Sequence, residues 1–247
     1  MKLLLSLLLF GVVFCSQAES LKFVAIDYPP YYGAQLKNNG PFVEIVQRAY
    51  AKTNYDVEVL FVPWQRAIEW SKQGKVDGII GAWHTKEREQ FLLYSEALYP
   101  NSMVLYKQAG SSISFSSFKE LGAQGLILGS VRGYLQLEKI ESSGLKINYV
   151  NNDIQNFKLL KKGRVQLVLV DKYYAKHMLK QPELKDIANH IEPMNHTVEH
   201  KQQFITISKQ TSNPMRKVKL FNQGLKALKD SGEFNQILFE YGFAPLR

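Results

Sequence analysis

Arginine side chains and one helix start are the candidates for binding a carboxylate in this sequence. Arg88 ends the segment Thr85-Lys-Glu-Arg, and a guanidinium presents parallel N–H donors that match a carboxylate in a bidentate way. Gly133 and Tyr134 are expected to begin a helix, whose free backbone N–H groups would also receive a carboxylate, and Arg132 adds positive charge there. The alternative for Arg88 is a surface arginine at a helix start that Thr85 caps.

Two further side chains follow predicted strands. Asp171 comes directly after the apolar segment 165–170, and Trp83 comes shortly after the segment 76–81. Because ligands of α/β proteins bind beyond the carboxyl ends of strands, we expect both residues near a binding cleft. Asp171 has a second interpretation as the cap of a helix that starts at Lys172, and one carboxylate can serve both purposes.

Alternating strands and helices must position these residues. Apolar spacing predicts strands over residues 21–26, 57–62, 76–81, 103–107, 126–129, 147–150, 165–170 and 204–208. It predicts helices over residues 42–52, 64–73, 134–141, 154–162, 172–179, 214–229 and 233–241. Segments 72–80 and 161–169 are alike, since each has a helix end, a left-handed glycine, one basic residue and a buried strand. Continuous apolar strands between helices imply parallel sheets covered on both faces, so the two units predict two α/β lobes.

The predicted strands 103–107 and 204–208 bracket the second unit and are expected to be hinge strands. Residues 19–105 plus 206–247 would then form lobe 1, and residues 106–205 an inserted lobe 2. The fold class expected is α/β and two-lobed, with a mostly parallel sheet flanked by helices in each lobe.

The first 18 residues have the pattern of a cleaved signal peptide. Lys2 precedes the stretch 3–14, which is apolar except for Ser6 and Gly11, and Ser16-Gln-Ala18 offers a small-x-small cleavage site. The stretch is too short to span a membrane. Bulky Phe14 before Cys15, the single cysteine, argues against a lipoprotein. We therefore expect export to the periplasm.

The formal net charge of +9 suggests, at first sight, a nucleic-acid partner. However, Lys and Arg are spread along the whole chain and mixed with Asp and Glu, whereas nucleic-acid binders gather such charge on one face. Together with export, this pattern favours a solvated basic surface and no nucleic acid. We expect a monomer without cofactor or metal.

Short motifs in a fixed order carry a resemblance to a known family. They are Tyr28-Pro-Pro-Tyr31, Gly40-Pro-Phe-Val-Glu-Ile45, Gly74-Lys-Val-Asp-Gly78, Thr85-Lys-Glu-Arg88, Val131-Arg-Gly-Tyr134, Asp171 and the closing segment 225–234. The mature chain resembles the bacterial extracellular solute-binding proteins of family 3. These are polar amino-acid receptors of ATP-binding-cassette (ABC) importers with the type II periplasmic-binding-protein fold. The resemblance implies a small amino-acid-like ligand held between two lobes, and an ABC permease as partner.

The resemblance also implies roles for individual residues. In the family, the arginine matching Arg88 holds the ligand's α-carboxylate and the aspartate matching Asp171 pairs with its α-ammonium group. Tyr28 matches an aromatic that lies against the ligand, and Trp64 and Arg66 lie in a Pro-Trp-x-Arg-Ala motif of one subgroup. Flat aromatics give contact area at small entropic cost and can add a cation–π contact, although core packing is the alternative for each.

Three departures from the family concern the ligand. The segment 81–84 before Thr85 is one residue shorter than in well-matched amino-acid receptors, and it carries Trp83. Tyr134 stands where the family usually has Ser or Thr, and Gln166 where many members have aspartate. These changes leave the identity of the ligand open.

Three other functions were considered from the sequence. A dehydratase-like enzyme on the same fold would need an acid with a raised pKa, and Glu44 and Glu87 are better explained as motif or cap residues. A metal site at His190, His196 and His200 lacks helical ligand spacing. A sensory role, in which the liganded protein docks on a membrane receptor, is not distinguished from transport by any feature of the sequence.

Overall fold

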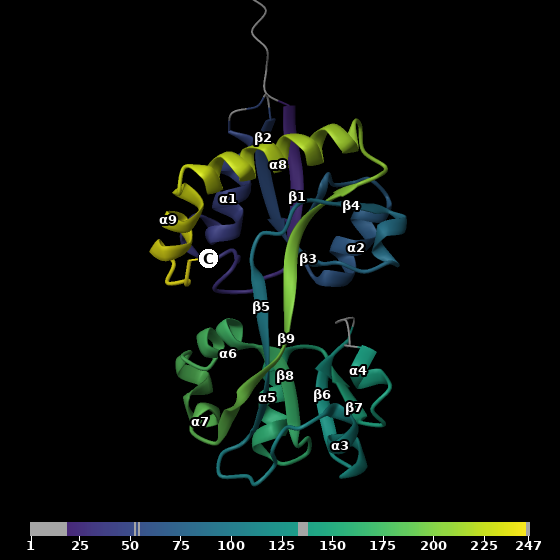
Figure 1. Cartoon of the computed structure of the whole chain (residues 1–247), viewed down its shortest axis with the longest axis vertical. Helices are drawn as coiled ribbons and strands as arrows, with labels where there is room; N and C mark the ends of the chain where they lie inside the picture. The colour runs from purple at the N-terminus through teal and green to yellow at the C-terminus, as the bar shows by residue number, and fades with distance from the viewer. Residues whose placement is uncertain (1–18, 52, 54, 133–137, 246–247) are drawn as a thin grey trace, which may run out of the picture.

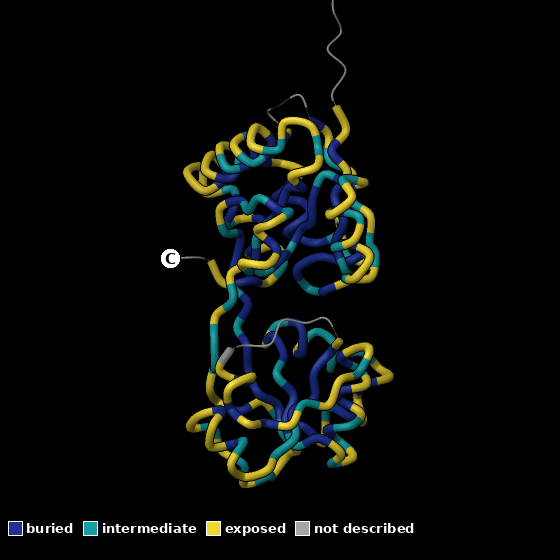
Figure 2. The backbone as a smooth tube through the Cα atoms, turned by 90° about the vertical axis from the view of Figure 1, so that its right-hand side faces the viewer, coloured by how far each residue is buried: buried dark blue, intermediate teal, exposed yellow. Residues whose placement is uncertain are grey.

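The chain folds into two lobes joined by two long strands (Figure 1). The computed structural model describes residues 19–51, 53, 55–132 and 138–245. The predicted signal peptide, residues 1–18, and the candidate residues Gly133 and Tyr134 lie outside the described residues. In Figure 2, buried backbone fills the interior of each lobe, and exposed segments surround it.

Lobe 1 carries the first four strands and the last two helices. Its elements are β1 (Glu19–Ala25), η1 (Lys37–Asn39), α1 (Pro41–Tyr50), β2 (Tyr55–Phe61), α2 (Trp64–Lys72), β3 (Gly78–Trp83), η2 (Arg88–Gln90), β4 (Leu92–Tyr94), α8 (Pro214–Asp230) and α9 (Glu233–Glu240). Pro63 stands at the N-cap of α2, close to the start that the sequence predicted. Gly74 has φ of +66° after α2 and Gly163 has φ of +68° after α5, which confirms the two left-handed glycines.

Lobe 2 repeats the strand–helix alternation. Its elements are α3 (Phe118–Ala123), β6 (Ile127–Val131), α4 (Glu138–Glu141), β7 (Lys146–Val150), α5 (Asp153–Lys161), β8 (Leu167–Asp171), α6 (Lys172–Met178), η3 (Pro182–Leu184) and α7 (Lys185–Ala188). The helix expected over residues 134–141 is described only as α4, because its first residues are not described.

One continuous sheet path runs through both lobes in the order β2-β1-β3-β9-β5-β8-β6-β7, with β4 also paired to β9. β1 is parallel to β2 and β3, and β6 is parallel to β7 and β8, as the apolar strand pattern predicted. The two strands shared by the lobes, β5 (Pro100–Gln108) and β9 (Ile191–Ser208), are antiparallel to each other.

The expected hinge segments 103–107 and 204–208 lie within β5 and β9. On both strands, the change from pairing within one lobe to pairing within the other lies N-terminal to the expected boundaries at 105/106 and 205/206. Residues of β9 up to Gln202 pair with β5, and those from Gln203 pair with β3. Met103 of β5 already pairs with β8 of lobe 2. Residue pattern identified the strands, but it carries no information on which neighbour each residue pairs with.

No helix in the described part of the chain is long and apolar enough to cross a bilayer.

Glu44 of α1 provides a test of the lobe 1 packing. Its carboxylate accepts hydrogen bonds from Asn38 Nδ2 at 3.1 Å, Arg48 Nε at 3.0 Å and Tyr241 Oη at 2.9 Å. Partial burial acts to raise the pKa of Glu44, but these hydrogen bonds outweigh it and hold the pKa below its ordinary value of 4.5. The charged carboxylate therefore stabilises the fold above that pH, and this contribution is lost as the pH falls through the lower folded-state pKa.

We expect Glu44→Gln to lower the free energy of unfolding by about 1.5 kcal/mol at pH 7. The difference from the wild type should shrink as the pH falls below 4.5. Urea unfolding of both proteins between pH 3 and pH 7 measures it. A difference that is constant over this range would show that the charge of Glu44 makes no contribution.

Candidate functional site

A cleft between the lobes, with a volume of about 450 Å³, lies at the carboxyl ends of the parallel strands. It is lined from lobe 1 by Ile26, Asp27, Pro63, Trp64 and Gln65, and from lobe 2 by Val131, Arg132, Asn151, Asn152, Asp153 and Tyr174. Cavities of roughly 300–1,000 Å³ are typical of small-molecule sites. The position agrees with the rule that ligands of α/β sheets bind beyond the strand ends. We call this pocket the ligand cleft.

Arg88 lies next to the ligand cleft, with its guanidinium 4.5 Å from the ring centroid of Trp64. Only 9% of the residue is exposed. Nη1 donates to the carbonyl oxygen of Trp83 at 3.0 Å, and the backbone N–H donates to Thr85 Oγ1 at 3.1 Å, so Thr85 does cap this turn. Burial lowers the pKa of Arg88. Within the described part of the chain, no Asp or Glu oxygen lies within the 4.0 Å of an ion pair with this guanidinium.

The aromatic candidates around Arg88 are held in different ways. Trp64, the first residue of α2, is half-buried and lines the ligand cleft. Trp83 ends β3, and its Nε1 donates to Asn101 Oδ1 at 2.7 Å. This hydrogen bond fixes the position of Trp83, whose carbonyl oxygen accepts from Arg88. Arg66 is exposed, stands 5.9 Å from the ring centroid of Trp70 and is not among the residues that line the cleft.

Asp171 is completely buried between the lobes. The hydroxyl of Tyr31 in lobe 1 donates to both of its oxygens at 2.9 Å. The backbone N–H groups of Ser102 and Tyr174 donate at 2.9 and 2.8 Å. Burial raises the pKa of the Asp171 carboxyl, and these hydrogen bonds act against that rise. The helix-cap interpretation is confirmed, since Asp171 is the N-cap of α6, whereas its contact with a ligand stays a prediction.

Tyr28 joins the lobes behind the ligand cleft. Its ring stacks on that of Tyr174 in lobe 2 at 4.3 Å between centroids and 6° between planes. The rings of Tyr31 and Tyr32 also lie close to it, with centroids at 5.8 and 6.0 Å. Only 7% of Tyr28 is exposed, so the residue is mostly occupied by this stacking.

Arg132 follows β6 and is an exposed residue at the edge of the ligand cleft. Its backbone N–H donates to the carbonyl oxygen of Val150 at 2.9 Å, which fixes the turn there.

Of the described residues that line the ligand cleft, sequence reasoning selected only Trp64 and Arg132, and it missed the polar residues Asp27, Asp153 and Tyr174 among others. Asp27 and Asp153 come shortly after β1 and β7, so the rule that selected Asp171 also applied to them. Burial raises the pKa of the Tyr174 hydroxyl, and the negative charge of Asp153 raises it further. Periodicity alone placed Tyr174 on the first turn of a helix without indicating the cleft.

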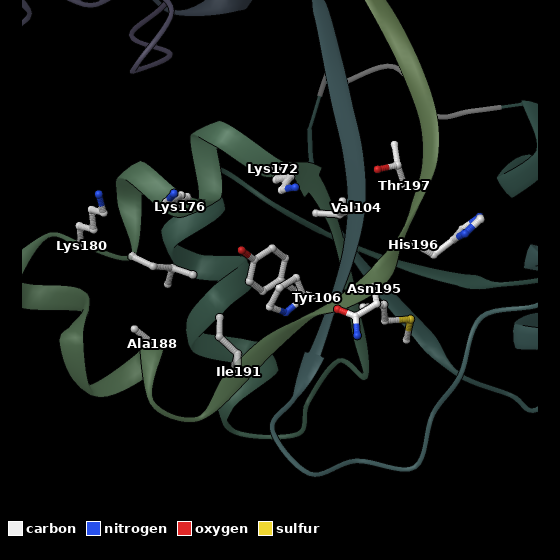
Figure 3. A pocket seen from close by; sticks show the side chains of 13 residues that line it. Val104, Tyr106, Lys172, Lys176, Lys180, Ala188, Ile191, Asn195, His196 and Thr197 are labelled. Atoms are coloured by element: carbon white, nitrogen blue, oxygen red, sulfur yellow. The ribbon is translucent and has the colours of Figure 1, made fainter. Parts of the chain in front are cut away.

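A second hollow, of about 600 Å³, lies in lobe 2 between α6 and the shared strands (Figure 3). Its rim carries Lys172, Lys176 and Lys180, and its floor includes Tyr106 and Ile191. None of its described lining residues comes from a lobe 1 helix or from β1 to β4, so this hollow is not a cleft between the lobes.

The described residues contain no group of three or more His, Cys, Asp or Glu side chains that could hold a metal ion. The three histidines considered from the sequence are separated. The ring of His196 stacks on Phe115 at 5.2 Å, Nδ1 of His190 is bonded to the carbonyl of Asp186, and Nδ1 of His200 is 3.3 Å from Ser102 Oγ.

Comparison with known proteins agrees with this architecture. An arginine-binding periplasmic protein of Mannheimia haemolytica is 27% identical over 243 residues, which cover 96% of this chain and 97% of the relative. A solved ancestral arginine-binding protein bound to arginine has a TM-score of 0.74 at 20% identity, covering 90% of this chain and 98% of that one.

A histidine kinase sensor domain with similarity to periplasmic binding proteins has a TM-score of 0.79 at 16% identity, covering 94% of this chain and all of that one. At these identities the solved structures show a shared fold, here the two-lobed type II periplasmic-binding-protein fold. The model of the bacterial extracellular solute-binding proteins, family 3, matches residues 23–244. The chain therefore belongs to that family of solute-binding proteins.

Proposed function

We propose that this protein captures a small amino acid or related carboxylate in the ligand cleft and delivers it, in the periplasm, to the permease of an ABC importer. The observation that carries the proposal is Arg88, a nearly buried cation with no carboxylate partner among the described residues. Removing a charge from water is costly unless it is compensated, so a buried guanidinium beside a cleft favours an anionic ligand.

The surroundings of Arg88 suit it to carboxylate capture. The Trp64 ring and the Trp83 carbonyl hold the guanidinium in one orientation. Because a planar guanidinium has five N–H donors, it can still present a bidentate pair to a ligand. In a partly desolvated site the attraction between the two charges is stronger than in water.

Release and capture would use the shared strands β5 and β9 as the hinge. Lobe closure around a ligand is the usual motion of two-lobed binding proteins. The Tyr28–Tyr174 stack and the Tyr31–Asp171 hydrogen bonds lie where the lobes meet, so they set the geometry from which closure starts. The proposal includes a monomer, because one chain supplies both walls of the cleft.

Binding without catalysis is part of the proposal. The two acids considered for a dehydratase, Glu44 and Glu87, are not among the residues that line the ligand cleft. Glu44 is instead engaged by Arg48 and Tyr241 in lobe 1. We expect a ligand that is incubated with the protein for a long time and then released to be chemically unchanged. Nuclear magnetic resonance spectra of the released ligand measure this.

The test is a thermal-shift screen of the mature protein, refolded to remove bound ligand. The panel contains the common amino acids, citrulline and small carboxylates that lack an amino group. A ligand that binds only the folded protein raises the melting temperature by linkage. We expect at least one α-amino acid to do so, and a panel without any shift would contradict the proposed function.

A further inference from the structure

Two carboxylates, one from each lobe, face the ligand cleft. Asp27 follows β1 in lobe 1, and Asp153 is the first residue of α5 in lobe 2. Both line the same pocket as the hydroxyl-bearing Tyr174. Among the lining residues that the structure describes, the remaining charged one is Arg132, which is exposed at the edge of the cleft.

The two carboxylates have different surroundings. Oδ1 of Asp27 accepts the backbone N–H of Ala34 at 2.8 Å, and among the described residues no Lys, Arg or His nitrogen lies within the 4.0 Å of an ion pair with Asp27. Asp153 is only 4% exposed and lines the same pocket as Tyr174. Burial raises the pKa of the Tyr174 hydroxyl, and the charges of Asp153 and Asp27 raise it further, in agreement with their place in the lining of the same pocket.

Asp171, by contrast, is fully engaged. One hydroxyl and two backbone N–H groups already donate to its two oxygens, and the residue has no exposed surface. Asp27 and Asp153 line the cleft and Asp171 is not among its described lining residues, so an ammonium group of a ligand in the cleft has Asp27 and Asp153 as its carboxylate partners.

We propose that Asp27 and Asp153 determine the specificity of the cleft by receiving two cationic groups of the ligand while Arg88 holds its carboxylate. The ligand class is a small carboxylate with a guanidinium or second ammonium group besides its α-ammonium. The inference rests on the proposed function, because it uses the same cleft and the same role of Arg88.

Lobe closure gives this arrangement a physical consequence. When the lobes approach, Asp27 and Asp153 are brought closer together, and the repulsion between like charges opposes closure of the empty protein. A ligand with two cationic groups replaces this repulsion by two attractions, whereas a ligand with only its α-ammonium supplies one of them. Ligands are therefore selected by charge, because each ligand stabilises the closed state according to how many of the two carboxylates it pairs with.

The experiment compares L-arginine with L-citrulline, its neutral near-isostere, by isothermal titration of wild type, Asp27→Asn and Asp153→Asn. We expect wild type to bind L-arginine at least about tenfold more tightly than L-citrulline. The variant that removes the partner of the side-chain cation should weaken L-arginine about tenfold and leave L-citrulline within about twofold, whereas the variant that removes the partner of the α-ammonium should weaken both ligands. Asp230→Asn, an exposed aspartate of α8 that does not line the cleft, is the matched control and should change neither affinity.

The outcomes separate this inference from the proposed function. If neutral amino acids, acidic amino acids or carboxylates without an amino group bind most tightly, the inference is wrong while the proposed function stands. An unchanged preference for L-arginine in both Asp27→Asn and Asp153→Asn also overturns the inference. If no member of the panel binds wild type, the proposed function itself fails.

Discussion

Replacing Arg88 by alanine is expected to weaken binding of the ligand by at least about 100-fold, because each lost charge-assisted hydrogen bond contributes about 1.5–3 kcal/mol. The variant should remain folded. Arg88 has no ion-pair partner among the described residues, so its removal leaves no buried carboxylate uncompensated. Isothermal titration gives the affinity, and the melting temperature of the ligand-free protein gives the stability.

The matched control is Arg216→Ala, an exposed arginine on α8 that does not line the ligand cleft. It should bind with the affinity of wild type. Retention of affinity in Arg88→Ala would show that the carboxylate is held elsewhere. Equal losses in both variants would point to a non-specific effect of net charge.

The second large effect is expected in stability. Asp171→Ala should lower the free energy of unfolding of the ligand-free protein by about 3 kcal/mol, because it leaves the Tyr31 hydroxyl and two backbone N–H groups buried without an acceptor. Urea unfolding measures this directly. This loss of stability is expected without any ligand, since the role assigned to Asp171 is to join the lobes.

Tyr31→Phe is the milder companion and removes only the hydroxyl that reaches Asp171 from lobe 1. We expect a loss of about 1–2 kcal/mol, so this variant still tests the role if Asp171→Ala does not fold. Asp230→Ala, on an exposed ion pair with Lys226, should change stability by less than about 0.5 kcal/mol. Unaltered stability in Asp171→Ala would mean that the interlobe hydrogen bonds contribute nothing net.

The sequence was sufficient for the repeated strand–helix units, because buried parallel strands leave apolar runs and helix ends leave glycines. Gly74 and Gly163 have the positive φ angles that these positions require. The expected strand 165–170 corresponds to β8, and the expected helix 172–179 corresponds to α6. The observed ends differ from the expected ends by at most two residues. Local pattern specifies such elements, since each depends on its own residues.

The site was predicted less completely, because its contacts join residues far apart in the chain. Asp171 was correctly placed at a strand end, but its partner Tyr31 lies 140 residues away and no spacing rule connects them. Arg66 was grouped with Trp64 by their shared motif, yet only Trp64 lines the cleft. Along β9 the paired strand changes from β5 to β3, and the choice of pairing partner is likewise not encoded in the strand pattern.

The central claim is that Arg88 holds the carboxylate of the ligand. It is tested most directly by combining a change in the ligand, from acid to carboxamide, with a change in the protein, Arg88→Ala. Isothermal titration compares the tightest amino acid of the screen with its carboxamide, in wild type and in Arg88→Ala. The account predicts that wild type prefers the acid by at least about 100-fold and that Arg88→Ala binds acid and amide within about threefold of each other. A preference for the acid that persists undiminished in Arg88→Ala would contradict it.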